Sequence, residues 1–518
     1  TASFPDRVEA EPHKNLGDLS EKQSFSANRA AKPLAGLILA ILFIVSALFA
    51  YRYFDTTRQI ESIAVMPFVN ASGNADVEYL SDGMTETLIS NLSSVTNLSV
   101  KPRSTVFRYK GKERDAKTIG KELNVQAILN GRVVQRGDQL TLSLELVDVE
   151  KDIVLWSQQY VRKQSDLVSL QSEIARDVSG KLKAKLSGAD AAKVEKNYTA
   201  NSDAYQLSLK GRFYWNKRTG ESIKQAIEFF NQAIEKDPNY ALAYVGLADS
   251  YLAMQNYADA PTSEVLPKAK AAALRALQID DSLAEAHASL AQIYKTSWQW
   301  GDAEEEFRRA IQLNPNYPTV HHYYSLALTN MGRLDEAMAE VKRAQELDPL
   351  SGIIAANVAL AYILRGDLDA AIAHCNNFID LDPSFPPIRM TLALAYQRQG
   401  RYEEAIAEAQ KGVELSRRAG NALGTLGYCY AVAKKRSEAL AILKELAEKH
   451  ARGESVGASL AYVYTGLGDK DKAFAWLEKD FQDRSGPLVN QITAFPILDT
   501  LRSDPRYADL LHRMGLKP

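Results

Sequence analysis

From residue 203 to residue 480, apolar positions follow the 3.6-residue period of amphipathic helices, and the whole pattern recurs every 34 residues. The stretch MGRLDEAMAEVKRAQELDP at 331–349 is followed by RGDLDAAIAHCNNFIDLDP at 365–383. One small residue marks the interval: Ala269, Ala303, Ala337, Ala371, Ala405, Ala439 and Ala473, with Ala226 standing 43 residues before the first of them. A fixed period of this size is typical of a solenoid.

Each unit has the residues that a pair of antiparallel helices needs. A glycine lies between two apolar-periodic stretches, where a positive φ lets the first helix end. A proline, which lacks an N–H, follows the second helix. A tyrosine fills the space between neighbouring pairs. The glycines are Gly332, Gly366, Gly400 and Gly468, the prolines are Pro238, Pro315, Pro349 and Pro383, and the tyrosines are Tyr251, Tyr294, Tyr362, Tyr396, Tyr430 and Tyr464.

This pattern closely resembles the tetratricopeptide repeat over residues 203–480. The resemblance implies a mainly α fold, an α-solenoid whose first helices line a concave groove. Such a groove binds a protein partner as an extended peptide or an amphipathic helix. The 43-residue interval predicts a nine-residue insertion at 256–267 that lengthens the turn of the second unit. Residues 481–518 are expected to form capping helices that shield the last repeat.

In the family's repeat frame, the groove-facing positions are first polar, then apolar and finally aromatic. The candidate peptide-binding residues are Glu285, Gln292, Lys295, His322, Asn330, Met390, Gln397, Arg398, Tyr428 and Tyr462, with Ile353, Leu360 and Leu394 between them. The three aliphatic residues have a second interpretation, as packing inside a tightly wound superhelix. Ala288 and Gln292 stand where chaperone-type clamps carry lysine and asparagine, so acidic C-terminal tails are not the expected ligand.

Residues 60–186 change to a pattern of short strands and helices. It predicts strands at 62–70 and 98–102, helices at 77–93 and 115–124, three strands within 125–160 and a long helix over 166–197. Leucines at every second position from 140 to 146 are typical of a half-buried antiparallel strand. This order predicts a small α/β domain with helices packed on a mixed sheet.

Five sequence blocks of this region, in order, resemble the FlgO-like or TolB-amino-terminal-like domain. They are IAVMPF, YLSDGMTETLISNLS, VKPRSTVFRYKGK, IGKELNVQAILNGRV and LWSQQY. In proteins of this kind the domain often lies between a membrane helix and tetratricopeptide repeats. The N-terminal module of such proteins is a Ser/Thr protein kinase, a winged-helix DNA-binding domain or a nucleotide cyclase. The resemblance therefore implies the C-terminal half of a bacterial membrane-anchored kinase or regulator.

An apolar segment precedes this domain. Residues 34–51 contain Ser46 as the one clearly polar residue, and as a helix they span about 27 Å, close to the thickness of a bilayer core. We therefore predict a transmembrane helix at 34–54, preceded by a disordered juxtamembrane linker at 1–33. Arg29 and Lys32 before the span favour an inside N-terminus, which places the later domains outside the cytoplasm.

The rest of the sequence gives little support for catalysis. The 62 basic and 64 acidic residues nearly balance, so nucleic-acid binding has no electrostatic support. Kinase, P-loop and zinc-binding motifs are absent, and no cofactor or metal is expected. Cys375 and Cys429, the two cysteines, fall on packed helix faces and are interpreted as buried thiols.

Two motifs are weighed against simpler interpretations. GESVG at 453–457 fits the nucleophile elbow of hydrolases, but it follows a helix rather than a strand, which favours a loop with an N-cap serine. His321 and His322 point about 100° apart on a helix, so packing and a groove position are expected rather than a metal site.

The sequence as a whole predicts a non-enzymatic interaction and sensing segment of a bacterial signalling protein. It is expected in the inner membrane as a single-pass protein, with a peptide or protein in its groove and dimerisation as a switch. A Ser/Thr kinase is the favoured effector. The alternative is a structural adaptor or assembly factor of an envelope complex without a signalling role.

Overall fold

The computed structural model describes Ser46 and residues 60–517, with gaps at 96, 113, 183–195, 258–259, 484–491 and 494. Residues 59–518 form one compact unit. The predicted linker (1–33) and the predicted membrane segment (34–54) lie outside the described residues, apart from Ser46. Among the helices that are described, none combines the length and apolar character needed to cross a bilayer.

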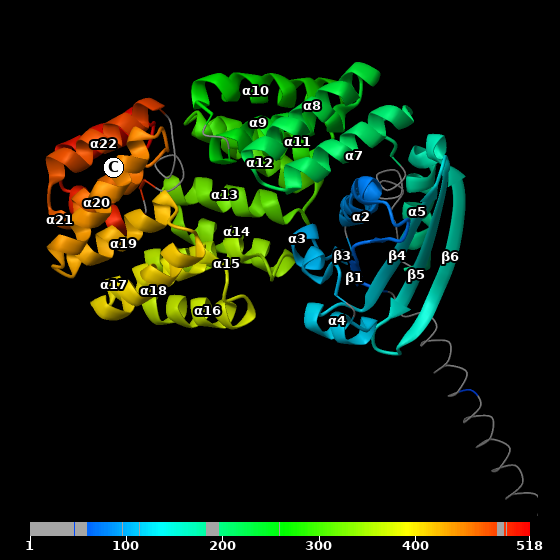
Figure 1. Ribbon diagram of the computed structural model, residues 1–518, viewed down its shortest axis with the longest axis horizontal. Coiled ribbons are helices and arrows are strands. Elements are labelled where there is room, and N and C mark those ends of the chain that lie inside the picture. Colours follow the sequence, from blue (N-terminus) through cyan, green and yellow to red (C-terminus); the bar gives the residue numbers. More distant parts are fainter. Residues whose placement is uncertain are drawn as a thin grey trace, which may run out of the picture. The chain divides into compact units, whose positions relative to one another are not determined.

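A mixed sheet forms the core of the α/β domain (Figure 1). Its strands are β1 (Ser62–Val65), β2 (Val69–Asn70), β3 (Ser99–Val100), β4 (Ala127–Arg136), β5 (Gln139–Asp148) and β6 (Ile153–Lys163). They run in the order β3-β1-β4-β5-β6, and β2 pairs with β4 beyond the end of β1. β1 is parallel to β3 and β4, whereas the pairs β4–β5 and β5–β6 are antiparallel.

The strand predicted over 62–70 is interrupted at 66–68. Pro67 has no N–H for the ladder, and pairing with β4 resumes at Val69. Phe68 is buried, its N–H donates to Thr85 Oγ1 at 2.9 Å, and its ring lies over Gly131. A Cβ at Gly131 would stand 2.2 Å from that ring, so this strand position requires glycine.

Helices pack their apolar residues against this sheet. They are α2 (Glu78–Ser93), α3 (Arg103–Val106), α4 (Ala116–Leu123) and α5 (Leu167–Lys181), with 3-10 turns η1 (Ala75–Val77), η2 (Phe107–Tyr109) and η3 (Gln164–Asp166). The alternating leucines of β5 are at most 1% exposed, as predicted. The helix predicted over 166–197 is wrong at its end, because α5 stops at Lys181 and residues 196–197 are not helical. α3 was not predicted.

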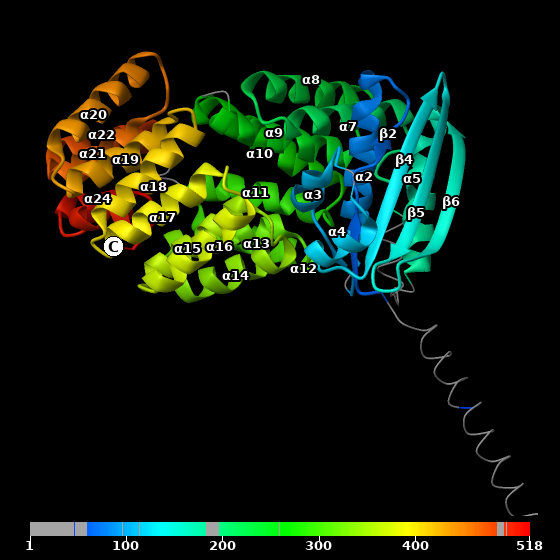
Figure 2. The ribbon, with the colours of Figure 1, turned by 60° about the horizontal axis from the view of Figure 1, so that its bottom comes forward.

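Eight helix pairs follow within the described residues (Figures 1 and 2). They are α7 (Ser202–Asn216) with α8 (Gly220–Lys236), α9 (Ala241–Tyr257) with α10 (Thr262–Ile279), α11 (Ala284–Thr296) with α12 (Trp300–Leu313), α13 (Pro318–Asn330) with α14 (Leu334–Leu347), α15 (Gly352–Arg365) with α16 (Leu368–Leu381), α17 (Pro386–Arg398) with α18 (Tyr402–Leu415), α19 (Gly420–Val432) with α20 (Arg436–Ala451), and α21 (Gly457–Leu467) with α22 (Lys470–Asp483). All eight marker alanines lie in the second helices and are at most 2% exposed, which confirms the predicted solenoid.

The turns inside the pairs use the left-handed backbone conformation that was predicted. Gly332, Gly366, Gly400 and Gly468 have φ between 75° and 84°. At the same repeat position Trp298 and Lys434 adopt φ of 60° and 62°, although L side chains rarely do so. The repeat geometry therefore imposes this conformation even where the sequence does not supply glycine.

The nine-residue insertion in the second unit does not have the structure predicted for it, a longer turn. α9 has 17 residues and α10 has 18, against 13 and 14 in the following pair. Residues 262–267 are helical, and Pro267 lies inside α10. Eight extra residues therefore lengthen the two helices. After the last pair come η4 (Pro496–Leu501) and α24 (Pro505–Arg513).

The left-handed positions give a paired prediction. Lys434→Gly should raise the free energy of unfolding by up to about 1 kcal/mol because glycine adopts positive φ without steric cost, whereas Gly366→Ala should lower it by about 1 kcal/mol. Urea unfolding of the full chain in detergent, followed by circular dichroism, measures both changes. Shifts of the same sign for the two variants would contradict the assigned backbone conformation.

Candidate functional site

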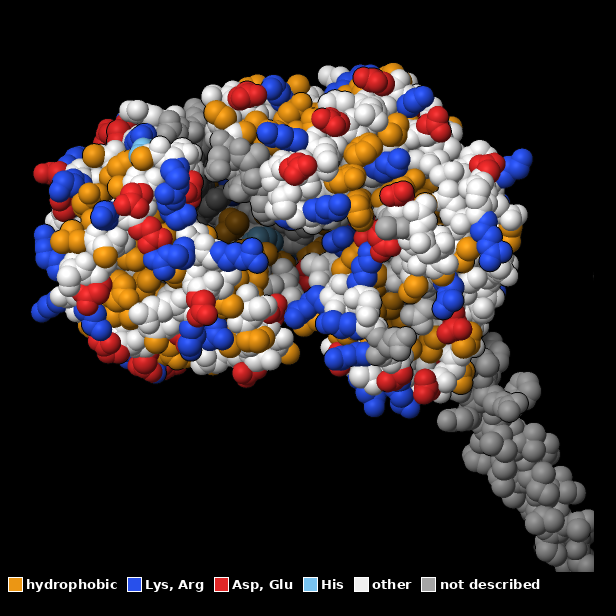
Figure 3. Space-filling model, viewed as in Figure 1, with side chains coloured by type: hydrophobic (Ala, Val, Ile, Leu, Met, Phe, Trp, Pro, Cys, Tyr) orange, Lys and Arg blue, Asp and Glu red, His pale blue; other side chains and the backbone are white. Residues whose placement is uncertain are grey.

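The candidate site is the groove side of the repeats, and most of its predicted residues do not face solvent. Lys295, His322, Asn330, Tyr428 and Tyr462 are buried, Glu285, Gln292, Met390 and Gln397 are half-buried, and Arg398 is exposed. Of the aliphatic candidates, Leu360 and Leu394 are buried and Ile353 is 46% exposed. Figure 3 shows a hollow between the earlier and later repeats, with Lys and Arg side chains along part of its rim.

A buried basic pair lies in the first part of this surface. Burial lowers the pKa of Lys295 to about 7. Burial and the nearby charge of Lys295 lower the pKa of His322 to about 4. His322 Nε2 lies 2.7 Å from Asn357 Nδ2, which donates to it. These two basic groups are therefore held inside the packed repeats, and a peptide cannot reach them in this conformation.

The later part of the groove contacts the end of the same chain, residues 492–493 and 495–517, called here the C-terminal segment. The hydroxyl of Thr493 donates to the carbonyl oxygens of Asn330 at 2.8 Å and Thr329 at 3.1 Å. Arg398 forms an ion pair with Asp499. The segment therefore makes polar contacts with the C-terminal ends of two first helices, α13 and α17.

Apolar contacts follow the same path. The ring of Phe495 lies 5.1 Å from that of Tyr462. A buried cluster unites the segment with several repeats: Trp300, Ile363, Leu394, Tyr428, Tyr462, Phe474 and Leu477 from the repeats, and Ile497, Leu498, Leu501, Tyr507, Leu510, Leu511 and Met514 from the segment. Burial raises the pKa of both Tyr428 and Tyr462. The aromatic candidates Tyr428 and Tyr462 therefore pack against the end of their own chain, and their role in binding a peptide stays a prediction.

The segment reaches much further than the last repeat. Trp300 of the third pair donates its indole N–H to the carbonyl oxygen of Met514 at 2.7 Å. Beside it, Trp298 stacks on Phe481 of α22 with ring centroids 4.7 Å apart. Residues of the third and eighth pairs thus meet at the C-terminal segment, and Figure 2 shows α24, in red, among the last helices.

The α/β domain and its linker to the repeats bind a second row of repeat residues. These are the aspartates that cap the second helices, called here the aspartate row: Asp237, Asp280, Asp348 and Asp382. Their partners are Thr199 for Asp237, Lys196 for Asp280, Ser104 and Thr105 for Asp348, and Arg108 for Asp382. Because the caps recur with the repeat, they form a strip of acceptors on one edge of the solenoid, interrupted at α12, which Asn314 caps.

Asp348 is the most buried member of this row, at 4% exposure. It accepts hydrogen bonds from the hydroxyls of Ser104 and of Thr105, the latter at 2.6 Å. Burial raises the pKa of its carboxyl, although the two hydroxyls and Lys101 oppose the shift. Burial also lowers the pKa of Lys101. These groups fix α3 of the α/β domain to the fourth repeat pair.

His321 has a structural role that also occurs in other repeats. Its Nδ1 lies 2.6 Å from Glu340 on the second helix, and its Nε2 lies 3.1 Å from the carbonyl of Pro315. His287 makes the same contacts with Glu306 and with the carbonyl of Asp281, 34 residues earlier. Arg389 and Glu408 occupy the same positions two repeats later and lie 2.8 Å apart. These pairs link the two helices of one unit.

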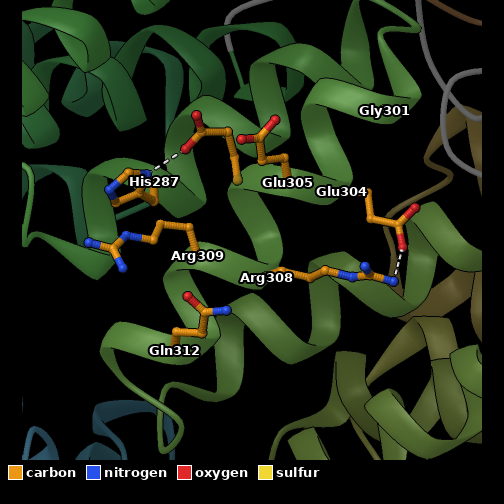
Figure 4. Close-up of a pocket in the computed structure, with 8 residues that line it drawn as sticks. His287, Gly301, Glu304, Glu305, Arg308, Arg309 and Gln312 are labelled. Atoms are coloured by element: carbon orange, nitrogen blue, oxygen red, sulfur yellow. Dashed lines mark hydrogen bonds and ion pairs between the residues drawn. The ribbon is translucent and has the colours of Figure 1, made fainter.

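A pocket of about 630 Å³ over α12 includes one of these pairs (Figure 4). Its lining residues are His287, Gly301, Glu304, Glu305, Glu306, Arg308, Arg309 and Gln312. Several of its charges pair with each other, as His287 does with Glu306 and as Arg308 does with Glu304 at 2.6 Å. This arrangement is typical of a solvated helix face and offers no nucleophile–base pair.

The remaining chemical motifs have structural explanations. GESVG at 453–457 lies between α20 and α21, so the strand that a nucleophile elbow requires is not there. The predicted N-cap role of Ser455 is wrong, because Val456 is the N-cap residue of α21. Burial raises the pKa of the Cys375 and Cys429 thiols to about 12, as expected for inert thiols. Within the described part of the chain, His, Cys, Asp and Glu form no cluster of metal-binding size.

Comparisons with known families agree with these two modules. Residues 221–261, 297–357 and 362–419 match the tetratricopeptide repeat. The chain contains tetratricopeptide repeats. Residues 58–177 match the second domain of HilA/YgeH-like transcriptional regulators. The α/β domain is therefore HilA-like, and its resemblance to the FlgO-like domain stays a prediction.

Two curated relatives share part of the chain. A protein of Rhizobium meliloti (strain 1021), provisionally named adenylate cyclase 3, is 30% identical over 233 residues, which are 44% of this chain and 39% of that protein. The transcriptional regulator HilA of Salmonella typhimurium is 26% identical over 132 residues, 26% of this chain and 24% of that protein. The matched stretches thus span about two fifths and one quarter of these relatives.

Solved structures of repeat proteins also align. PilF of Pseudomonas aeruginosa aligns with 22% identity over 42% of this chain and 94% of its own, with a TM-score of 0.33. PilW, a type IV pilus biogenesis factor, aligns with 21% identity over 43% of this chain and 97% of its own, with a TM-score of 0.35. Because both TM-scores lie below 0.5, these likenesses do not bear on function.

Asp348→Ala should loosen the α/β domain from the repeats. It leaves the buried hydroxyl of Thr105 without its acceptor, which costs about 1–3 kcal/mol. Asp382→Ala is the matched control at the next repeat, where a half-exposed ion pair at 3.7 Å contributes less than about 1 kcal/mol. Hydrogen exchange of the α3 amides measures the loosening. Equal exchange in both variants would contradict a central role for Asp348.

His287 should make stability depend on pH. Burial lowers its pKa, but the bonds to Glu306 and to the Asp281 carbonyl outweigh it, so the pKa is raised above 6.5. The stabilisation is therefore fully present below about pH 6.5 and is lost as pH rises through the folded-state pKa. The melting temperature of His287→Gln should fall further below wild type at pH 5.5 than at pH 8.5. In a Glu306→Gln background that pH dependence should disappear; its persistence would refute the pairing.

Proposed function

We propose that this chain is the protein-binding, regulatory part of a bacterial signalling protein, without a catalytic centre of its own. The observation that carries the proposal is the attachment of a HilA-like domain to a tetratricopeptide solenoid through the aspartate row. A protein bound by the repeats can act on this domain because the buried Asp348 joins the two through hydrogen bonds from Ser104 and Thr105. Protein binding is the function that tetratricopeptide repeats support most directly.

The names of the two relatives support two effector classes. One is named as an adenylate cyclase and the other as a transcriptional regulator. We therefore place a nucleotide cyclase and a DNA-binding regulator ahead of the Ser/Thr kinase that the sequence favoured. We assign the effector to a part of the protein other than the α/β domain and the repeats, since the matched stretches cover only 39% and 24% of the two relatives.

The location belongs to the proposal as well. The apolar segment 34–54 is proposed to cross the inner membrane once, with the α/β domain and the repeats outside the cytoplasm. A single membrane helix transmits little by itself. Association of two chains is therefore the proposed route by which a bound partner changes the effector.

A topology reporter tests this proposal. Alkaline phosphatase, which is active only outside the cytoplasm, is fused after Pro518, and the matched variant carries Leu42→Arg and Phe43→Asp in the apolar segment. Each charge at the centre of a membrane helix costs about 2.5–3.5 kcal/mol, so the variant should lose both reporter activity and membrane retention. A silent wild-type reporter would place the repeats in the cytoplasm and contradict the sensing role, favouring an internal scaffold.

A further inference from the structure

We propose that the C-terminal segment is a built-in ligand of the repeat groove, and that the groove binds an amphipathic helical segment of another protein that resembles it. This inference rests on the proposed protein-binding function and names the class of its partner. The partner segment would carry an apolar face, a carboxylate opposite Arg398 and a hydrogen-bond donor opposite the carbonyls of Thr329 and Asn330.

The segment contacts the repeats as a ligand does, by crossing them. A helix that merely continued the solenoid would pack on α22 in the repeat register. α24 does pack on α22, through Arg506–Asp471 and Arg513–Glu478. The segment also contacts α13 through Thr493, α17 through Asp499 and α21 through Phe495, which a continuing helix would not do. It also reaches the N-terminal end of α12, where Trp300 donates to Met514. These contacts come from four repeat pairs, because α21 and α22 belong to the same pair.

The apolar contacts would supply most of the affinity. Ile497, Leu498 and Leu501 of η4 are at most 2% exposed, as are Leu510 and Leu511 of α24. They meet the aromatic groove positions Tyr428 and Tyr462. Large aromatic side chains in a buried cluster are typical of the residues that dominate binding energy at interfaces.

The ionic contacts would set the position of the segment more than its affinity. Arg398 and Asp499 have 36% and 38% of their side chains exposed, and Arg506 lies 2.8 Å from Asp471, which is 90% exposed. Arg513 bonds Glu478 at 2.9 Å. Exposed pairs of this kind contribute little each and are screened by salt. Arg398 would therefore position a carboxylate of the partner segment while adding little to its affinity.

The covalent link favours the built-in ligand over a free one. A tethered segment acts at an effective concentration of about millimolar. An added peptide must displace the tethered segment from the groove, so the uncut chain should bind the peptide weakly. Release of the segment would also separate Trp300 of the third pair from Met514, which removes one of the contacts between the early repeats and the end of the chain.

The test uses the full chain with a protease recognition sequence in place of residues 484–491, folded first and then cut. The probe is a fluorescent peptide of residues 492–518, followed by anisotropy. The cut chain should exchange its fragment for the probe and keep its helical circular dichroism, with an affinity at least tenfold tighter than that of the uncut chain. A Leu498→Asp peptide should not bind at the concentrations used.

Charge reversal tests whether Arg398 fixes the position of the segment in the groove. A peptide with Asp499→Arg should bind about two- to fivefold more weakly to the cut chain, as expected for an exposed pair, and Arg398→Asp in the repeats should restore its binding. Asp509→Asn is the matched control, because Asp509 pairs only with Arg513 inside the segment among the contacts described and is 67% exposed. It should bind like the unchanged peptide.

Three results would overturn the proposal. Exchange that occurs only with loss of helical signal would make the segment an integral part of the fold. Failure of Arg398→Asp to rescue the reversed peptide would reject the assigned position. Dimers of the uncut chain that disperse when the peptide is added would identify a second copy, not another protein, as the partner. Each result is independent of the topology reporter, so failure of this inference differs from failure of the proposed function.

Discussion

The close approach of two helices at a small residue is the constraint on which the rest of this structure depends. A fully packed alanine recurs in every second helix of the solenoid, and a larger side chain there would push the first helix away. Because each pair packs in the same way, equivalent residues of successive units come to lie in rows. One row is the set of helix-capping aspartates, and another is the groove formed by the first helices.

These two rows have different occupants, and each occupant comes from the same chain. The α/β domain and its linker use hydroxyl, ammonium and guanidinium groups on the aspartate row, with Asp348 as the buried contact. The C-terminal segment uses mainly apolar residues on the groove. The hydrogen bonds of the buried Asp348 require a defined geometry, so they are specific for the α/β domain. The contacts in the groove are mainly apolar with exposed ion pairs around them, so another segment of similar shape can replace the C-terminal segment there.

Sequence reasoning succeeded wherever a feature depends on residues close together in the chain. Ala337, Gly366 and Pro349 each act on helices next to them in the chain, so the spacing of such residues predicted the pairs and their turns. The interruption at Pro67 and the end of α5 at Lys181 were missed, because the apolar pattern does not show where a ladder hydrogen bond is lost or where a helix ends. Trp298 shows that tertiary packing can impose a left-handed turn without the glycine that would announce it.

That the C-terminal segment occupies the groove could not be predicted from the sequence, for a different reason. The positions of Tyr428, Tyr462 and Arg398 on the first helices follow from the repeat frame, but their occupant lies between about 30 and 100 residues away along the chain. The apolar pattern of 495–516 showed that this stretch packs against the repeats. It did not show how far it reaches, because Trp300 and Met514 are 214 residues apart. Burial of Lys295 and His322 is likewise a property of the assembled superhelix.

Hydrogen exchange of the intact chain, resolved by mass spectrometry, tests the central claim most directly, namely that the C-terminal segment occupies the groove and can leave it while the repeats stay folded. The account predicts that amides of α24 are protected, but exchange at least tenfold faster than those of α13 and α17. Exchange of α24 together with these helices, or no protection of α24 at all, would contradict it.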